Sequence, residues 1–310
     1  MSNPLDPEVM SPAERVEEAA SLLARTRRGA PIAVAELTGS RSVGLASLAP
    51  WRQLGLMWGT MPRLPSPQTT DRWKHVRSLL VGVEGHLADR EAEWLYFAAA
   101  TCRAEGEVVE VGSFKGKSAI CLAKGIEISG ADGRLIAIDP HCAPAPTDPE
   151  LRGAHSSEPE MKANLARAGV ADLVDVRVQY SGEVARTWQS PIRLLWLDGD
   201  HTLEGVQADF DCWTPHLSEG GLLAMHDVLH RFEGPASVFL QHVLRSPGWA
   251  GIGFVKSIGF ARKAAAANLT GSRRTRLQAA LLARMATLSR RPGRRGAVGY
   301  KLLRAIVLRV

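Results

Sequence analysis

Short apolar runs alternate with helical patterns over the middle of the chain. Runs rich in β-branched and aliphatic residues predict five strands, at residues 108–111, 135–138, 174–178, 194–197 and 222–225. Helical patterns are predicted to begin between these runs and after the last one, near Gly116, Glu158, Gly182, Leu203 and Pro235. Strict alternation of strand and helix indicates βαβ crossovers, and therefore a parallel sheet with helices on both faces.

Two further apolar runs, at residues 252–255 and 258–261, are separated only by Lys256 and Ser257. This spacing predicts a closing hairpin, which completes a set of seven strands. Ahead of the first strand, apolar residues at helical spacing predict a helix from residue 89 to about 104. The expected fold class is α/β, with a doubly wound, mostly parallel, seven-stranded sheet and helical extensions at both ends.

The length of 310 residues accommodates one such domain with two extensions. We predict an N-terminal helical and irregular extension over residues 1–80, the α/β domain over 81–263, and a basic amphipathic tail over 264–310. Within the first extension, Ser11, Pro12 and Glu14 have the form of a capping box and predict a short helix. Residues 29–70 lose periodicity, and we expect them to form part of a lid.

Charge divides the chain. Residues 81–233 hold 13 Lys and Arg against 25 Asp and Glu, whereas residues 234–310 hold 15 Lys and Arg and no acidic residue. In the tail, one helical face carries Leu277, Leu281, Met285 and Leu288. Basic amphipathic helices bind anionic membrane surfaces or partner grooves, and a solvated extension is the alternative. Tyr300 is the only aromatic residue of the tail, which argues against nucleic-acid binding.

The four cysteines, Cys102, Cys121, Cys142 and Cys212, form no CxxC pair and lie in or near apolar stretches. We interpret them as buried thiols in a reducing compartment. The sequence shows neither a basic-then-apolar leader nor an apolar run of the roughly 20 residues that a membrane span needs. The expected location is the cytoplasm, with peripheral membrane contact through the tail.

A glycine-rich loop, from Glu110 to Gly116, follows the first strand and opens a helix. Gly112 allows the backbone to approach a ligand, and the N–H groups at the helix start offer an anion site. A P-loop needs four residues between Gly112 and the Gly-Lys-Ser at 116–118, and only three are present. A dinucleotide fingerprint would need glycine where Phe114 stands, so ATP and NAD are disfavoured, while a purely structural turn stays open.

Polar residues follow the later strands at the edge where ligands bind in such sheets. Asp139 ends the second strand, where a carboxylate can accept hydrogen bonds from ribose hydroxyls, or can cap the turn before Pro140. Ser181 follows the third strand, where an adenine ring would rest. These positions predict a nucleoside site.

The fourth and fifth strands each deliver carboxylates and a histidine at their carboxyl ends. The two segments are Asp198-Gly-Asp-His201 and His226-Asp227. We expect Asp198, His201, His226 and Asp227 to converge beside the nucleoside site, where carboxylate oxygens suit Mg²⁺ or Mn²⁺. A buried, hydrogen-bonded core imidazole is the competing interpretation of His226.

These motifs resemble a known family. The residues at 83–85, 109–118, 138–140, 196–201 and 220–228 look like the class I methyltransferases grouped with macrolide sugar O-methyltransferases and cephalosporin-hydroxylase-like proteins. The resemblance spans about residues 80–263 and implies a Rossmann-like fold that binds S-adenosylmethionine. Its most specific part is the pair of motifs Asp-Gly-Asp-His and His-Asp.

The resemblance also implies roles for individual residues. Asp198 and Asp227, with His226, would hold the divalent metal, and His201, next to Asp198, would act as general base. In sugar methyltransferases of this kind an acidic ligand is expected where this chain has His226. The cofactor contacts implied are Glu110, Gly112, Ser113, Gly116, Lys117, Ser118, Asp139, Ser181 and Asp198.

The function predicted from these residues is O-methylation of a hydroxyl on a small molecule by S-adenosylmethionine, assisted by Mg²⁺ or Mn²⁺. A sugar, a natural product or a lipid-linked acceptor would suit, and a homo-oligomer is compatible with the chain. Two alternatives stay open: a non-catalytic nucleoside-binding interaction protein, and an NAD-dependent oxidoreductase.

Overall fold

The computed structural model describes residues 67–141, 156–230, 232–264, 273–289, 300–301 and 303–305. Contacts divide the chain into two compact units, residues 1–53 and 54–310. The first unit, including the helix predicted at Ser11, lies outside the described residues, as does most of the segment expected to form a lid. The description that follows therefore concerns the second unit.

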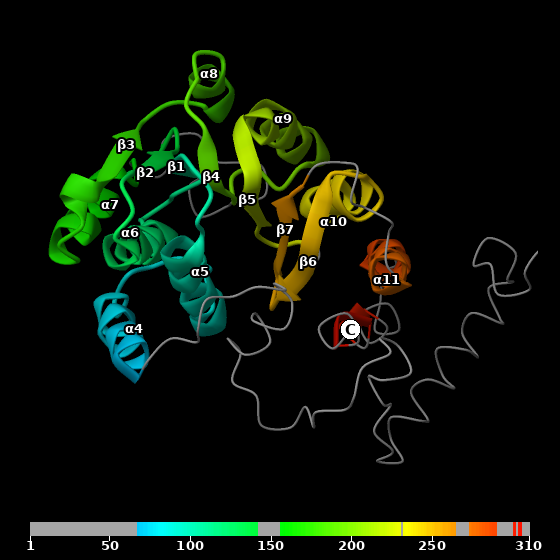
Figure 1. The fold of residues 1–310 in the computed structure, drawn as a ribbon, viewed down its shortest axis with the longest axis horizontal. Helices are drawn as coiled ribbons and strands as arrows, with labels where there is room; N and C mark the ends of the chain where they lie inside the picture. Colours follow the sequence, from blue (N-terminus) through cyan, green and yellow to red (C-terminus); the bar gives the residue numbers. More distant parts are fainter. Residues whose placement is uncertain are drawn as a thin grey trace, which may run out of the picture. The chain divides into compact units, whose positions relative to one another are not determined.

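A seven-stranded sheet organises this unit (Figure 1), in the strand order β3-β2-β1-β4-β5-β7-β6. Strands β1 to β5 pair in parallel, and β7 pairs antiparallel with both β5 and β6. The predicted α/β class, the seven strands and the closing hairpin are thus confirmed. The strands are β1 Glu107–Val111, β2 Leu135–Ile138, β3 Val174–Arg177, β4 Ile192–Leu197, β5 Leu217–Met225, β6 Trp249–Val255 and β7 Ile258–Lys263.

Helices fill the crossovers, as right-handed βαβ connections require. The first described helix, α4, was not predicted, because Trp73 and Val76 are the only buried side chains described in its polar stretch. The helices are α4 Pro67–Leu79, α5 Asp89–Thr101, α6 Lys117–Ser129, α7 Glu158–Arg167, α8 Ser181–Ala185, α9 Leu203–Trp213, α10 Glu233–Phe239 and α11 Arg273–Ser289, with short turns η3 Ala171–Leu173, η4 Thr214–His216 and η5 Leu240–Leu244.

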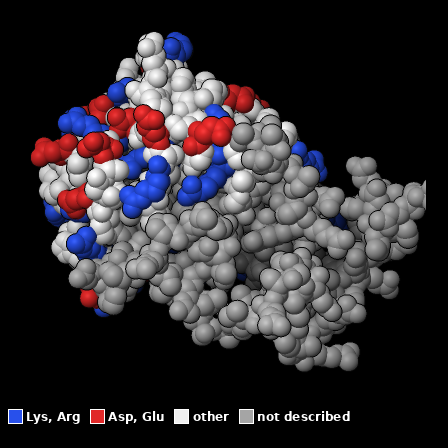
Figure 2. All heavy atoms as spheres, viewed as in Figure 1, with Lys and Arg blue, Asp and Glu red and all other residues white. Residues whose placement is uncertain are grey.

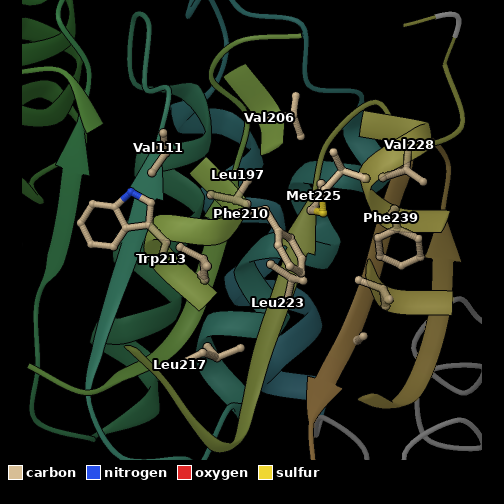
Figure 3. Packing of buried hydrophobic residues seen from close by; sticks show 14 of the residues in the cluster. Val111, Leu197, Val206, Phe210, Trp213, Leu217, Leu223, Met225, Val228 and Phe239 are labelled. Carbon is tan, nitrogen blue, oxygen red and sulfur yellow. The ribbon is translucent and has the colours of Figure 1, made fainter. Parts of the chain in front are cut away.

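Alternation along the strands sends side chains to opposite faces of the sheet. Figure 3 shows part of the core on one face, where Val111, Leu197 and Met225 of three neighbouring strands pack with Phe210 and Trp213 of α9. All five side chains are buried, and burying each contributes roughly 1.5–3 kcal/mol to folding. This core holds the carboxyl ends of β1, β4 and β5 in fixed positions.

The C-terminal helix α11 joins the same core. Ala279, Leu282 and Met285 are buried within the cluster that underlies the sheet, and α11 contacts α10 and η5. The hydroxyl of Tyr300 donates a hydrogen bond to the carbonyl of His230. Met285 belongs to the helical face that was expected to meet a membrane, but it packs inside the domain. Leu277 of the same face is exposed. Within the described residues, no helix is both long and apolar enough to cross a bilayer.

The prediction that all four cysteines are buried is only partly confirmed. Cys102 and Cys121 are buried, but Cys212 is exposed, because it lies on the solvent side of α9 beside the inward-facing Trp213. Cys142 lies outside the described residues.

Candidate active site

The residues that follow three central strands lie side by side. Backbone N–H groups of Gly112, Asp198 and His226 donate to the carbonyls of Ile138, Val111 and Leu197, at 2.9, 2.8 and 3.0 Å, and so continue the sheet ladder. The parallel register of neighbouring strands thus continues to their carboxyl ends. This alignment brings the polar residues after β4 and β5 next to the glycine-rich loop after β1.

The sheet itself requires a glycine at position 112. Its φ is +86°, and a Cβ placed there would lie 2.2 Å from the carbonyl oxygen of Asp198. Gly112 thus allows a close approach between the backbones of two neighbouring strand ends, and its predicted contact with a ligand stays a prediction. Gly116, with φ +85°, begins α6, and Phe114 between them also has a positive φ. The loop makes a tight, left-handed turn into the helix.

Asp139 braces this loop. Its Oδ2 accepts hydrogen bonds from the N–H groups of Ser113 and Phe114, both at 2.8 Å, and its Oδ1 accepts one from the N–H of His141 at 2.7 Å. Two loop N–H groups are thus bound by Asp139. A carboxylate has about four acceptor positions, so room remains for a ribose hydroxyl. The turn-capping interpretation and the ribose interpretation are therefore compatible.

Glu110 is fully buried between the sheet and α6. Burial raises the pKa of Glu110 to about 8, and the nearby hydroxyls of Ser118 and Ser113 offset this only in part. Neither carboxylate oxygen has a protein hydrogen bond of normal geometry. A buried carboxyl next to the loop, with no hydrogen bond of normal geometry, suits the cationic amino group of S-adenosylmethionine. The residues present therefore fit the cofactor that the sequence implies.

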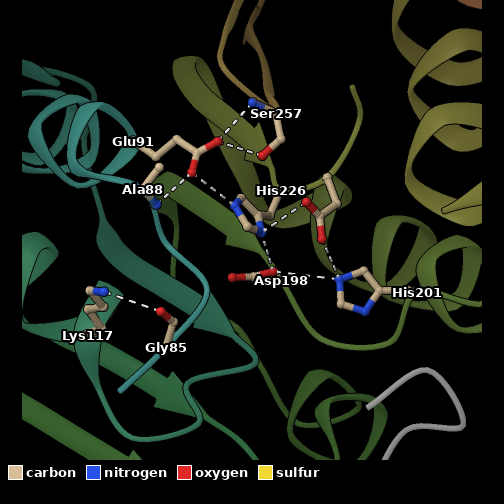
Figure 4. Close-up of polar contacts among 9 residues, drawn as sticks. Gly85, Ala88, Glu91, Lys117, Asp198, His201, His226 and Ser257 are labelled. Atoms are coloured by element: carbon tan, nitrogen blue, oxygen red, sulfur yellow. Dashed lines mark hydrogen bonds and ion pairs between the residues drawn. The ribbon is translucent and has the colours of Figure 1, made fainter. Parts of the chain in front are cut away.

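Lys115 of the loop and Lys117 at the start of α6 both bind the segment that precedes α5, and Figure 4 shows the contact of Lys117. The Lys117 ammonium donates to the carbonyl of Gly85 at 3.2 Å. Lys115 pairs with Glu84 at 2.7 Å and with Glu160 of α7 at 2.8 Å. Figure 2 shows basic and acidic side chains interspersed over the described part of one face. Lys117, expected to contact the cofactor, thus anchors a neighbouring segment.

His201 lies between the two aspartates. Its Nε2 is 3.2 Å from Asp227 Oδ2 and 3.9 Å from Asp198 Oδ1, and its ring stacks on Phe232 with centroids 4.4 Å apart. Burial disfavours the charged ring, but the contact with Asp227 and the charge of Asp198 outweigh burial and raise the pKa of His201. The same contact lowers the pKa of Asp227, against the effect of burial.

His226 lies between the carboxylate of Glu91 on α5 and the carboxylate of Asp198 after β4 (Figure 4). Its Nδ1 is 3.0 Å from Asp198 Oδ1 and 3.6 Å from Asp227 Oδ1, and its Nε2 is 3.6 Å from Glu91 Oε2. Burial opposes charge on this ring, yet Asp198, together with Glu91, raises the pKa of His226 well above its usual value. Burial raises the pKa of Asp198, and the nearby His226 ring offsets this rise only in part. The proton therefore belongs to the cluster rather than to one residue.

Glu91 is a site residue that sequence reasoning missed. It lies on α5, is buried, and accepts hydrogen bonds from the N–H and hydroxyl of Ser257 at 2.8 and 2.6 Å. Its other oxygen accepts from the N–H of Ala88 at 2.8 Å. A glutamate at the third position of a helix is an ordinary capping residue. The one available signal was its place next to Ala92, on the face predicted to be buried.

Two further acids have structural partners. Asp200 accepts from the N–H of Thr202 at 2.8 Å and from its hydroxyl at 2.9 Å, and so orders the start of α9. Asp209 of α9, also missed, pairs with the hydroxyl of Ser181. Burial raises the pKa of Asp209 to about 6. Asp209 also lines a small pocket with Asp198 and His201, which connects Ser181 to the rest of the site.

The metal expectation does not fit this arrangement. In the part of the chain that the structure describes, no group of three or more His, Cys, Asp or Glu side chains is placed to hold a metal ion. A histidine ligand must offer a ring nitrogen lone pair to the metal, but both nitrogens of His226 face carboxylates. The expected set of Asp198, Asp227 and His226 is thus brought together as an ion-paired cluster.

Comparison with known proteins agrees with this description. Residues 109–228 match the family model described as a methyltransferase domain. Among solved structures, the chain is similar to cofactor-bound Rv0187 from MTB, with 20% identity, a TM-score of 0.46, and coverage of 64% of this chain and 90% of that one. It is similar to the O-methyltransferase NovP, with 13% identity, a TM-score of 0.48, and coverage of 58% and 84%.

A third similar structure is an O-methyltransferase from Bacillus cereus in complex with SAH, with 16% identity, a TM-score of 0.46, and coverage of 62% of this chain and 91% of that one. The family match spans the glycine-rich loop, Asp139, and the strand ends that carry Asp198 and Asp227. Residues 109–228 of this chain therefore match a methyltransferase domain.

Proposed function

We propose that the protein transfers a methyl group from S-adenosylmethionine to a hydroxyl oxygen of a small molecule, with His201 as general base. The observation that carries the proposal is the contact of His201 with Asp227, 3.2 Å long, at the sheet edge beside the glycine-rich loop. Alcohol oxygens are poor nucleophiles near neutral pH, so a base matters more for O-methylation than for N-methylation.

The chain's own residues supply position and proton transfer. Methyl transfer is an in-line displacement, so most of the assistance is alignment of acceptor oxygen, methyl carbon and sulfur. The bound cofactor supplies the methyl group, and the electron pair of the broken carbon–sulfur bond stays on sulfur. His201 takes the acceptor's hydroxyl proton as the oxygen–carbon bond forms. The Asp227 carboxylate stabilises the imidazolium that results.

Cofactor binding is assigned to the loop and the residues around it. Glu110, next to the loop, would bind the amino group, and Asp139 the ribose hydroxyls. Ser181, held by Asp209, would border the base. Gly112, Ser113, Gly116 and Ser118 shape the loop, and Lys117 fixes the neighbouring segment. No step of the proposed reaction is assigned to a metal ion.

The acceptor class we propose is a sugar or another hydroxylated small molecule, including a natural product or a glycolipid. The support is chemical, since a base between carboxylates suits a neutral alcohol better than an anionic acceptor. We further propose that residues 141–159 and 29–70 contribute to the acceptor pocket, and only part of these two segments lies within the described residues.

The proposal is tested with labelled S-adenosylmethionine and a panel of sugars, phenols and glycolipids. Transfer is scored by mass, and the methylated atom is identified by NMR. His201→Ala should abolish transfer but keep cofactor binding, whereas His75→Ala, on the exposed face of α4, should leave both unchanged. Full transfer by His201→Ala would refute the assigned base.

The two alternatives give other results in the same samples. A nucleoside-binding protein without catalysis would bind S-adenosylmethionine and methylate no acceptor. An NAD-dependent oxidoreductase would be stabilised thermally by NAD rather than by S-adenosylmethionine, because a ligand raises the melting temperature of the state that it binds.

A further inference from the structure

Three carboxylates and two imidazoles meet at the ends of β4 and β5. Glu91, Asp198 and Asp227 are the acids, and His201 and His226 lie between them (Figure 4). All five side chains are mostly buried: the exposed fraction is 21% for Asp198 and lower for the other four. Buried carboxylates need a compensating positive charge or hydrogen-bond donors. The question is which group supplies it.

The ring of His226 already lies where a shared cation would be needed. Its Nδ1 is 3.0 Å from Asp198 Oδ1 and 3.6 Å from Asp227 Oδ1, so it contacts the two acids expected to share a metal. Mg²⁺ requires oxygen ligands at about 2.0–2.1 Å in octahedral geometry. An ion between these two carboxylates would have to displace the Nδ1 edge of the ring.

The charge of Glu91 opposes a rotation of the ring away from Asp198. Its Nε2 faces Glu91 Oε2 at 3.6 Å, so a rotation that freed Nδ1 would also break this contact. Glu91 is itself fixed by the N–H and hydroxyl of Ser257 and by the N–H of Ala88. The helix α5 and the hairpin between β6 and β7 thus hold the ring from the side opposite to Asp198.

We propose that the imidazole of His226, clamped between Glu91 and Asp198, replaces a divalent cation in this site, so that the enzyme transfers its methyl group without a metal. The inference rests on the proposed function for its catalytic meaning, but the binding property can be measured alone. Glu91 is then a positioning residue, which acts on the acceptor site through His226 and Asp198.

The test is the affinity of the full-length protein for Mn²⁺, followed by the electron paramagnetic resonance signal of the free ion. Wild-type protein should leave the Mn²⁺ signal unchanged. His226→Asp replaces the ring with a third carboxylate, and we expect it to bind Mn²⁺ at least about tenfold more tightly, which corresponds to about 1.4 kcal/mol. His226→Asn removes the ring but adds no carboxylate, so its affinity for Mn²⁺ should lie between those of the wild type and of His226→Asp.

Tight Mn²⁺ binding by the wild type that is lost in both Asp198→Asn and Asp227→Asn would overturn the inference. This measurement uses no His226 variant, so it tests the proposal even if His226→Asp fails to fold. Once an acceptor is known, transfer by wild-type enzyme should survive EDTA, and loss of transfer restored by Mg²⁺ would also overturn it. Failure of the proposed function is distinct, because it appears as cofactor binding without transfer to any acceptor.

Discussion

Asp227 Oδ2 lies 3.2 Å from Nε2 of His201, although the two residues follow different strands of the sheet. Asp227 adopts φ +54°, a backbone conformation that a non-glycine residue rarely takes. Strain of this kind persists where the surrounding structure fixes it, often at a functional site. The turn after β5 therefore places this carboxylate against the proposed base.

This contact predicts the pH dependence of methyl transfer. Because a general base must be neutral, kcat/KM should rise as pH increases through the pKa of His201, which Asp227 and Asp198 raise above 6.5. In Asp227→Asn, which tolerates the same backbone conformation, the rise should shift to lower pH and the maximum should fall. Steady-state kinetics from pH 5.5 to 9 measure both. An unshifted profile in the variant would show that Asp227 does not act on the base.

Glu110 predicts a proton release on cofactor binding. Its pKa of about 8 keeps most of the carboxyl protonated at pH 7, and the cofactor's cationic amino group should lower that pKa. Calorimetry of S-adenosylmethionine binding at pH 7, in two buffers with different ionisation enthalpies, should detect close to one proton released. Glu110→Gln should release none, and an unchanged proton count in this variant would place the source elsewhere.

Gly130, at the end of α6, is a matched control for a substitution at Gly112 in the glycine-rich loop. Both have positive φ, but a Cβ at 112 would lie 2.2 Å from Asp198, whereas at 130 no atom lies within 4 Å. Gly130→Ala should cost about 1–2 kcal/mol of unfolding free energy. Gly112→Ala adds overpacking and should cost more than about 3 kcal/mol. Urea denaturation measures both, and equal costs would contradict the predicted backbone contact.

Asp139 predicts a selective loss of cofactor affinity. Asp139→Ala frees the N–H groups of Ser113 and Phe114 and removes the proposed ribose contact, so S-adenosylmethionine should bind at least about tenfold more weakly. Asp132→Ala, in an exposed turn before β2, serves as the control and should bind normally. Equal affinities of the two variants, measured by calorimetry, would remove Asp139 from the cofactor site.

The sequence predicted the sheet because its strands carry strong local signals. Strands such as Leu135–Ile138 are apolar throughout, as burial on both faces requires. Alternation with helices then determined which strand ends lie together. For this reason Asp198, His201, His226 and Asp227 could be expected near one another before any coordinates were known.

Tertiary contacts between distant segments were not predictable in the same way. Glu91 contacts His226 and Ser257 only because α5 packs against the last hairpin, and no periodic pattern encodes that pairing. The contact of Gly112 with the Asp198 backbone was also not predictable, since the sequence identifies a required glycine but not the atom that approaches it. Docking of α11 through Met285 depended likewise on an apolar surface formed by α10 and η5.

In the proposed reaction, His201 removes the hydroxyl proton of the acceptor during methyl transfer from S-adenosylmethionine. The most direct measurement is single-turnover methyl transfer to an identified acceptor by wild-type protein and His201→Ala, both saturated with cofactor. The transfer rate should be about 100- to 10,000-fold lower in the variant, with cofactor affinity unchanged. A variant that transfers the methyl group at the wild-type rate would contradict this role of His201.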